Sequence, residues 1–202
     1  MAPSHYAAGV LPMTFIERGT TPIFLVGRDL RDLHGSSPGG SSWSDWAGKA
    51  ERCDHGDPVH TAAREMWEET FGQLLSVKAM IARLRQGRCI RLLSQTQNGN
   101  LFHFFVAVVP YRGDFCGAFE RSLHFLQARC AGSGSGSARS MVEKIGAQWV
   151  TADELFGDEL PKRSVFAQTI AQHRGVLSRL TDAWAWQDAV AKNAEDDAWN
   201  MS

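Results

Sequence analysis

Two apolar runs near the start of the chain have the length and composition of β-strands. They cover residues 5–15 and 21–29, and the turn-forming sequence Glu-Arg-Gly-Thr separates them. Residues 34–42 are almost all Gly, Ser and Pro, which is typical of a loop. A third, shorter strand is predicted within residues 43–51. The beginning of the chain therefore favours a sheet.

The segment 58–71 changes to the periodicity of a helix. Asp57 is a candidate N-cap, and Pro58 suits the first helical turn because its missing N–H costs nothing there. Gly72 supplies a left-handed stop. With about 100° between successive residues, one face of this helix is apolar and is expected to be buried. That face comprises Val59, Ala62, Ala63, Met66 and Thr70.

The rest of the chain alternates between helical and extended patterns. Asn98-Gly99 lies between two apolar runs and predicts a two-residue turn. The expected elements are a helix at 73–86, a hairpin at 88–112, a helix at 117–129, a flexible Gly-Ser loop at 131–140, a strand leading into a helix at 146–155, and a helix at 163–190. Strands interrupted by helices predict an α/β domain. We expect one domain over residues 1–190, followed by a polar, acidic tail at 191–202.

The composition of the chain limits the classes of protein to which it can belong. With 202 residues, 44% of them hydrophobic and 21% charged, the chain can bury one core of ordinary composition. The formal net charge of −1 provides no general attraction for nucleic acid or an anionic membrane. The start of the chain lacks the pattern of a signal peptide, and no apolar run approaches the roughly 20 residues that span a bilayer. The cysteines are widely spaced, so we expect a cytoplasmic protein without a membrane partner.

Three glutamates are crowded on the predicted helix, away from its apolar face. Glu65 precedes Glu68 and Glu69 by three and four positions, and each like-charge pair costs a helix about 0.2–0.5 kcal/mol unless something offsets it. Arg64 can pair with Glu68 one turn later. Hard divalent cations bind carboxylate oxygens, so this face suits a magnesium site. A solvated acidic helix face is the alternative, and it is the favoured one when this stretch is considered alone.

The sequence Arg-Glu-Met-Trp-Glu-Glu-Thr at 64–70 resembles the second half of the Nudix box, Gx5Ex7REUxEExGU, in which U is aliphatic. Supporting matches are residues 46–51, with Gly48, Lys49 and Glu51, to the entry of the box, residues 7–12 to the first strand of the family, and residues 148–155 to its late tryptophan strand. The resemblance covers about residues 6–170. It implies the Nudix fold, which is a mixed β-sheet sandwiched between α-helices.

The chain departs from that box in the connecting loop. Arg64 follows Gly48 by sixteen positions, two more than in the pattern. The isolated glutamate of the pattern has no direct equivalent, and Asp54 and Asp57 are the two alternatives. Phe71 stands where the box has its closing glycine, which comes one residue late. These differences concern the loop geometry and leave the acidic helix intact.

The resemblance implies a metal-dependent site on this helix. Glu65 and Glu69 would be the principal ligands of Mg²⁺ or Mn²⁺, and Glu68 a third. The backbone carbonyl of Gly48 would complete the shell. Arg64 would hold a glutamate in the orientation that binding requires.

A further general base is often drawn from a later loop in this family. Glu143 is the first candidate because a flexible Gly-Ser loop precedes it, so it could move toward a bound substrate. Glu120 is a second candidate. An ordinary exposed glutamate explains Glu143 equally well.

Basic and aromatic residues supply candidates for substrate binding. Residues 71–112 contain no Asp or Glu but several Lys and Arg, and Arg88 and Arg91 are the best candidates to hold substrate phosphates or an RNA backbone. A solvated basic surface is an equal alternative. Trp43 and Trp46 lie beside the predicted metal loop and could stack on a nucleobase, although core packing is the more frequent role of tryptophan.

The predicted function is therefore hydrolysis of a pyrophosphate bond in a nucleoside diphosphate linked to another moiety. A nucleotide, a dinucleoside polyphosphate, a nucleotide sugar and an mRNA cap are the candidate substrates. Expected partners are such a small molecule, capped RNA, and a second copy of the chain. The alternative is a catalytically weak Nudix-fold module that binds nucleotide or RNA or serves in an assembly. The three retained glutamates argue against that alternative.

Overall fold

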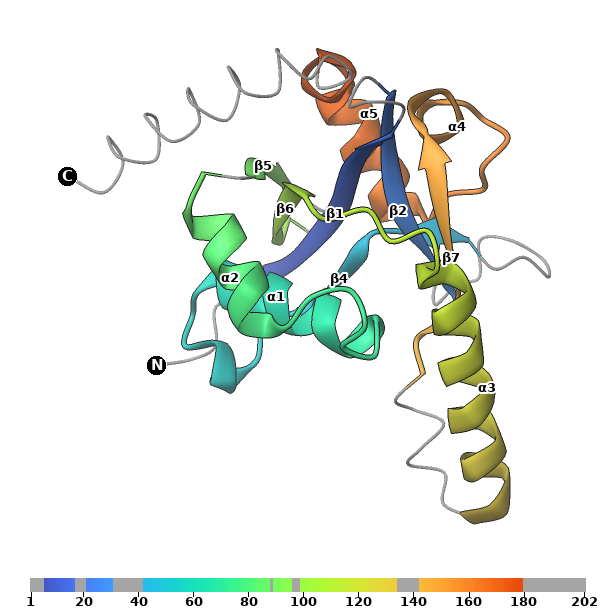
Figure 1. Cartoon of the computed structure of the whole chain (residues 1–202). Coiled ribbons are helices and arrows are strands. Elements are labelled where there is room, and N and C mark those ends of the chain that lie inside the picture. The colour runs from blue at the N-terminus through green and yellow to red at the C-terminus, as the bar shows by residue number, and fades with distance from the viewer. Residues whose placement is uncertain are drawn as a thin grey trace.

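The computed structural model of the chain describes residues 6–16, 21–30, 42–87, 89–95, 99–133 and 142–179. Within them, seven strands form one sheet in the order β3-β2-β1-β6-β5, while β4 pairs with β1 and β7 pairs with β2 (Figure 1). The strands are β1 (Tyr6–Ile16), β2 (Thr21–Asp29), β3 (Trp43–Ser44), β4 (Trp46–Lys49), β5 (Cys89–Gln95), β6 (Leu101–Val108) and β7 (Lys144–Thr151). The helices are α1 (Pro58–Glu69), α2 (Val77–Arg85), α3 (Phe115–Ser133), α4 (Ala152–Phe156) and α5 (Ser164–Arg179).

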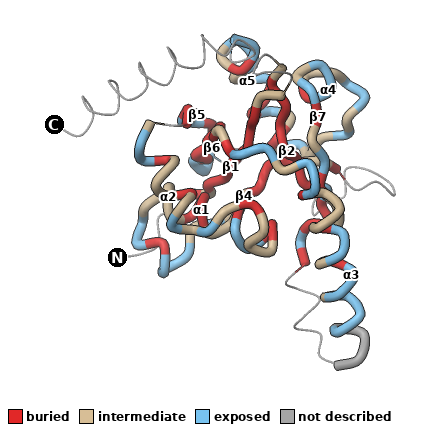
Figure 2. The backbone as a smooth tube through the Cα atoms, in the orientation of Figure 1, coloured by how far each residue is buried: buried red, intermediate tan, exposed pale blue. Residues whose placement is uncertain are grey.

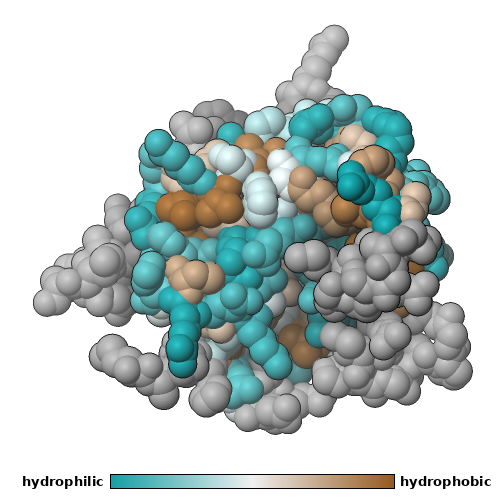
Figure 3. Space-filling view, turned by 90° about the horizontal axis from the view of Figure 1, so that it is seen from below, coloured by the Kyte–Doolittle hydropathy of each residue, from teal (hydrophilic) through white to brown (hydrophobic). Residues whose placement is uncertain are grey.

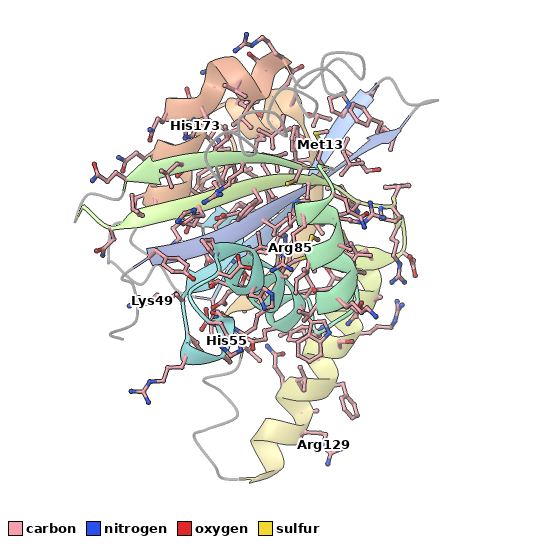
Figure 4. All side chains as sticks on the ribbon, turned by 90° about the vertical axis from the view of Figure 1, so that its left-hand side faces the viewer. Met13, Lys49, His55, Arg85, Arg129 and His173 are labelled. Carbon is pink, nitrogen blue, oxygen red and sulfur yellow. The ribbon has the colours of Figure 1, made fainter. Side chains whose placement is uncertain are left out.

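The sheet is mixed, and helices cover both of its faces. β1 runs parallel to β6, whereas the other strand pairs are antiparallel. Helices α1, α2 and α3 contribute to one hydrophobic cluster, and α4 and α5 contribute to the other. In Figure 4, His173 of α5 and Arg85 of α2 lie on opposite sides of the sheet. The predicted α/β class, with a mixed sheet between helices, is confirmed.

β1 is buried on both faces, which explains its nearly continuous apolar sequence. Ala8 and Val10 belong to the cluster under α1, whereas Leu11 and Met13 belong to the cluster under α5. A strand that is covered on both sides needs no alternation of apolar and polar residues. The buried positions accordingly follow the centre of the sheet in Figure 2.

α1 begins as the sequence predicts. The side chain of Asp57 accepts a hydrogen bond from the backbone N–H of Val59, and Pro58 occupies the first turn. Ala62, Ala63 and Met66 are buried, as the periodicity indicated. Val59 is only half-buried, and Thr61 is buried although it was not on the predicted face.

The chain reverses direction at the end of α1 through two left-handed residues. Gly72 has a φ of 68°, as expected for the predicted stop, but Phe71 also has a positive φ, of 53°. This conformation is unfavourable for a residue with a side chain. The ring of Phe71 stacks on that of Phe119, with 5.0 Å between centroids, and this contact with α3 offsets the backbone strain.

Several element boundaries differ from the predicted ones. α2 begins at Val77 rather than at 73, because Ser76 caps it by accepting a hydrogen bond from Ala79. α3 extends to Ser133, so the first part of the predicted loop at 131–140 is helical. α5 ends at Arg179 within the described residues. The end of the predicted helix at 163–190 and the tail at 191–202 lie outside them, so the predicted domain limits stay a prediction.

On the face that Figure 3 shows, the described surface is mostly hydrophilic and carries separate hydrophobic patches. Its exposed large hydrophobic side chains are Leu30, Trp67, Leu93, Leu101, Tyr111 and Phe125. No helix in the described part of the chain is both long and apolar enough to cross a membrane.

Replacing Met66 with alanine tests the packing of α1 on the sheet. Met66 is fully buried in the cluster under α1. Met66→Ala is expected to lower the free energy of unfolding by about 2–5 kcal/mol, because it removes buried apolar atoms and leaves a cavity. Urea denaturation measures the change. Leu93→Ala, at a side chain that is half exposed, is the control and should cost less than about 1 kcal/mol. Equal effects of the two variants would contradict the packing described.

Candidate active site

Arg64 is the most highly connected side chain of α1. Its Nε and Nη2 donate to the two carboxylate oxygens of Asp54, at 2.9 and 3.0 Å. Its Nη2 also donates to the backbone carbonyl of Lys49, at 2.9 Å. Its Nη1 lies 2.9 Å from Oε1 of Glu65 and 3.0 Å from Oε2 of Glu68. Arg64 therefore joins α1 to the loop after β4, and a single nitrogen atom of its guanidinium contacts both Glu65 and Glu68.

Asp54 is buried beneath this loop and receives further hydrogen bonds. One of its oxygens accepts from the backbone N–H of Glu51 at 2.8 Å and from the hydroxyl of Thr61 at 2.9 Å. Burial raises the pKa of Asp54, but the hydrogen bonds from Arg64, Glu51 and Thr61 outweigh that effect and hold the pKa below its ordinary value. Asp54 is therefore an ionised partner for Arg64 at neutral pH.

Asp57 has a different role from Asp54. It caps α1, and its other carboxylate oxygen pairs with Arg85 at 2.7 Å. Of the two alternatives for the isolated acid of the box, Asp54 is the one that Arg64 contacts. The loop between β4 and α1 contains the short 3-10 turn Arg52–Asp54.

Glu65 lies directly against the backbone of Gly48. A Cβ added to Gly48 would overlap with the carboxylate of Glu65, so this approach requires a glycine. Burial raises the pKa of Glu65 to about 7; Arg64 opposes the rise, and Glu68 and Glu143 add to it. A carboxylate with a pKa near neutrality can exchange a proton at neutral pH.

Glu69 is the least exposed of the three glutamates. The exposed fraction of its side chain is 6%, compared with 12% for Glu65 and 49% for Glu68. Its Oε2 accepts a hydrogen bond from the backbone N–H of Ala47 at 2.9 Å, and its Oε1 lies 3.6 Å from Nζ of Lys144. Burial raises the pKa of Glu69 well above its ordinary value, and the charge of Lys144 opposes this rise.

Lys144, at the start of β7, is the charged residue of this region that the sequence did not indicate. Its side chain is 1% exposed. Nζ donates to Oδ1 of Asp29 at 2.7 Å, and also to Oγ of Ser44 at 2.5 Å and the backbone carbonyl of Asp45 at 2.9 Å. Gly27 leaves room for the stem of Lys144, since a Cβ there would come within 2.9 Å of its Cδ. The strand predicted from the sequence began at residue 146. Lys144 therefore lay outside the predicted alternation of buried and exposed residues, and nothing indicated that its side chain points into the protein.

Glu143 is exposed and lies near the acidic face of α1. Its backbone carbonyl accepts a hydrogen bond from Leu30 at 2.8 Å, which anchors the start of β7. Its carboxylate charge contributes to the raised pKa of both Glu65 and Glu69. Glu120 lies on α3 and is not among the main causes of either raised pKa. The arrangement thus favours Glu143 over Glu120 as the candidate base.

The prediction that Trp46 stacks on a nucleobase is wrong. Trp46 is fully buried, its Nε1 donates to the backbone carbonyl of Leu25 at 3.0 Å, and its ring meets those of Phe115 and Phe119 edge to face. It packs in the core because β4 turns it inward, toward α3. Trp43 is half-buried and packs against the cluster under α5, on the face of the sheet opposite to α1.

Of the two predicted arginines, Arg91 is described, and it does not lie at the acidic face. Arg91 lies on the edge strand β5, with Nη2 3.0 Å from Nδ1 of His103 and its guanidinium over the ring of Phe105. Burial lowers the pKa of His103 to about 4, and the charge of Arg91 adds to that effect. β1 and β6 lie between β5 and β4 in the sheet, which separates Arg91 from Gly48. Arg88 lies outside the described residues.

The carboxylates suit a divalent cation that keeps some water or phosphate ligands. Burial raises the pKa values of Glu65 and Glu69; neighbouring carboxylates add to the rise, while Arg64 and Lys144 oppose it. In the described part of the chain, no group of three or more His, Cys, Asp or Glu side chains could hold a metal ion by itself. Mg²⁺ commonly binds through one or two carboxylates, with water and phosphate oxygens as its other ligands. The donor set fits that mode and does not form a closed protein cage.

The similarity of this chain to known proteins lies in its backbone structure. No protein-family model matches the chain, and no curated protein sequence matches it. Similar solved structures include a Nudix hydrolase from M. Smegmatis, RenU, with 14% identity, a TM-score of 0.45, and coverage of 88% of this chain and 89% of that one. A mutT/nudix family protein from Listeria innocua has 17% identity and a TM-score of 0.47, covering 88% and 96%. The NUDIX domain of Shewanella oneidensis NrtR, complexed with ADP ribose, has 11% identity and a TM-score of 0.47, covering 88% and 90%. At these values, function has to be argued from the side chains.

Replacing Asp54 with asparagine tests the connection between Arg64 and the loop. Asp54→Asn is expected to lower the free energy of unfolding at pH 7 by about 3 kcal/mol, because it leaves a largely buried guanidinium without its main charged partner. Asp57→Asn is the control and should cost less than about 1 kcal/mol, since asparagine caps a helix well and the ion pair with Arg85 is exposed. Urea denaturation measures both changes.

The difference between the wild type and Asp54→Asn should also depend on pH. Because the folded pKa of Asp54 is lowered, its ionised form stabilises the protein above the ordinary Asp pKa of about 4. That contribution is lost as the pH falls through the lowered folded pKa. The two proteins should therefore approach equal stability in acid. A difference that is unchanged at low pH would contradict the charged pair.

Proposed function

We propose that the protein is a Nudix-family hydrolase that uses Mg²⁺ or Mn²⁺ to cleave a pyrophosphate bond in a nucleoside diphosphate linked to another moiety. One observation carries this proposal: Arg64, fixed by Asp54, contacts both Glu65 and Glu68, and Glu65 lies beside Gly48. A merely solvated acidic face would leave its glutamates exposed and apart. Here Glu65 and Glu69 are largely buried instead, which supports a built site.

The residues of this site have distinct proposed roles. A divalent cation, when bound, would neutralise charge on the phosphate oxygens and lower the pKa of a bound water. Carboxylates from the set Glu65, Glu68 and Glu69 would hold it, together with the backbone carbonyl of Gly48 and with water or phosphate oxygens as the remaining ligands. Arg64 would keep Glu65 and Glu68 oriented, because its guanidinium cannot move without losing its bonds to Asp54.

Glu143 is the proposed general base. It is exposed, so water can reach it, and its charge acts on Glu65 and Glu69. It would accept a proton from the water that attacks the phosphorus atom. Its place at the start of β7 is fixed by the backbone bond to Leu30, whereas its side chain is free to turn toward a substrate.

The proposed substrates are the classes named from the sequence: a nucleotide, a dinucleoside polyphosphate, a nucleotide sugar or an mRNA cap. Arg88 stays a candidate substrate contact, and a cytoplasmic location and a homodimer stay predictions. Trp43 is a weaker candidate, because it packs on the face of the sheet opposite to α1. Arg91 is a weaker candidate than the sequence implied, because its guanidinium is engaged by His103 and Phe105.

A second candidate function is a module that binds a nucleotide or RNA without efficient hydrolysis. The observation that favours it is the ammonium group of Lys144, 3.6 Å from the carboxylate of Glu69. A permanent positive charge beside a metal-binding carboxylate would weaken metal binding. The two functions are separated by whether phosphate is released.

Metal should stabilise the folded protein if the acidic face binds it. Adding MgCl2 or MnCl2 is expected to raise the melting temperature, since a ligand that binds only the folded state stabilises that state. Glu69→Gln should abolish this rise while leaving the metal-free protein folded and slightly more stable, because a buried carboxylate with a raised pKa is removed. Differential scanning fluorimetry measures both. Glu159→Gln, at an exposed glutamate, should keep the wild-type response. A metal response unchanged in Glu69→Gln would place the metal elsewhere.

Turnover distinguishes the hydrolase from the binding module. Glu65→Gln and Glu143→Gln are each expected to lower turnover by at least about a hundredfold, within the range that a positioned acid–base group contributes. Affinity for a nucleotide should fall much less, because binding does not require proton transfer. Phosphate release from a panel of the proposed substrates, with each metal, measures turnover, and Glu159→Gln serves as the control. A wild-type protein that binds a nucleotide but releases no phosphate product from any class would be the binding module.

A further inference from the structure

Three carboxyl groups and one ammonium group are buried together behind the acidic face of α1. Counted over the whole residue, the exposed fractions of Asp29, Asp45 and Glu69 are 6%, 5% and 8%. Lys144 is 1% exposed and is the only buried lysine or arginine in the described part of the chain. Burial of a charge without a partner is strongly unfavourable, so these groups must compensate one another.

The ammonium group of Lys144 lies between two of these carboxylates. It donates to Oδ1 of Asp29 at 2.7 Å and lies 3.6 Å from Oε1 of Glu69. Oδ2 of Asp29 has no hydrogen-bond partner among the described residues. The carboxyl group of Asp45 takes no bond from Lys144, which contacts only its backbone carbonyl. One positive charge is therefore shared by Asp29 and Glu69.

The cluster connects the acidic helix to segments far away in the chain. Lys144 begins β7, Asp29 ends β2, Ser44 lies in β3 and Glu69 ends α1. The stem of Lys144 passes over Gly27, where no side chain obstructs it. A fully buried ammonium with three hydrogen bonds cannot swing away when a ligand arrives, so its charge is a fixed property of the site.

We propose that Lys144 is a built-in counter-cation that limits how tightly the acidic face binds a divalent metal, and that Asp29 sets the strength of this limit. The inference rests on the proposed function, in that the metal binds through Glu65, Glu68 and Glu69. A metal that approaches Glu69 meets a positive charge 3.6 Å from its ligand oxygen. Asp29 neutralises part of that charge.

The consequence is a site that favours metal together with phosphate over metal alone. Like charges a few ångströms apart repel strongly where water is largely excluded. The phosphate oxygens of a substrate bring negative charge and offset this repulsion. The metal is then held firmly while the substrate is bound and weakly after the products leave.

The proposal is tested on the full chain by titrating the metal-free protein with MnCl2 in an isothermal titration calorimeter. The titration is done at pH 8 without nucleotide. Lys144→Met removes the charge but keeps an unbranched apolar stem, and it is expected to tighten Mn²⁺ binding by at least about tenfold. Asp29→Asn keeps the shape but leaves the charge of Lys144 unshared, and it is expected to weaken binding by at least about tenfold. The double variant should lie within about threefold of the wild type, because the two charges cancel.

A matched control separates charge from structure. Ser44→Ala removes one hydrogen-bond acceptor of Lys144 without changing any charge, and it should leave Mn²⁺ affinity within about threefold of the wild type. A purely structural role for the cluster predicts instead that Lys144→Met, Asp29→Asn and Ser44→Ala all weaken binding. That result would overturn the proposal. Should Lys144→Met fail to fold, the contrast between Asp29→Asn and Ser44→Ala decides: equal affinities of these two variants overturn it.

The outcome also separates this inference from the proposed hydrolase. A wild-type protein that binds Mn²⁺ and releases phosphate, with variants that all shift in one direction, overturns the inference and leaves the hydrolase intact. Mn²⁺ binding by Lys144→Met that exceeds that of the wild type supports the inference even where no substrate is cleaved. No Mn²⁺ binding by any of the proteins, Lys144→Met included, overturns the inference, whereas the hydrolase is overturned only by the absence of phosphate release.

Discussion

The pairing of Arg64 with Asp54 is the interaction on which the rest of the site depends. It joins the middle of α1 to the loop after β4 by two hydrogen bonds, and the same guanidinium then reaches Glu65 and Glu68. Apolar contacts such as those of Met66 fix the helix on the sheet, but they do not fix the directions of carboxylates. A planar guanidinium with fixed donor directions does, which is why arginine suits this position better than lysine.

The site also requires space for charged side chains next to the backbone, and two glycines provide it. Gly48 allows the carboxylate of Glu65 to lie against β4, and Gly27 allows the stem of Lys144 to lie against β2. In both cases a methyl group would displace the charged residue. The two glycines thus set the distances between backbone and charge on which the proposed metal site and the Lys144 cluster depend.

The same sheet serves two separate cores. The strands β1 and β6 present apolar residues to α1, α2 and α3 on one side and to α4 and α5 on the other. All the residues of the acidic site lie on the side of the sheet that α1, α2 and α3 cover, or at the edge of that side, next to β4 and β7. A tryptophan on β4 accordingly becomes a core residue, since the side of the strand on which Trp46 points is already covered by α3.

The sequence by itself determined the features that depend on neighbouring residues. The start of α1 follows from Asp57 and Pro58, its buried face from a helical period, and its acidic face from three glutamates within one turn. The strand at 21–29 was predicted at its full length, and its centre at 22–26 is a continuous apolar run. Such signals are local, and the backbone expresses them wherever the segment packs.

Only the tertiary structure decided which distant groups meet. The choice of Asp54 over Asp57 depends on how the loop folds back on Arg64. For Trp46 the sequence left both stacking on a nucleobase and core packing open, and the contact with α3 decides for the core. Lys144 and Asp29 are 115 positions apart, and no periodicity relates them. Their pairing arises because β7 lies beside β2 in the sheet, and the pairing of strands is a property of the whole chain.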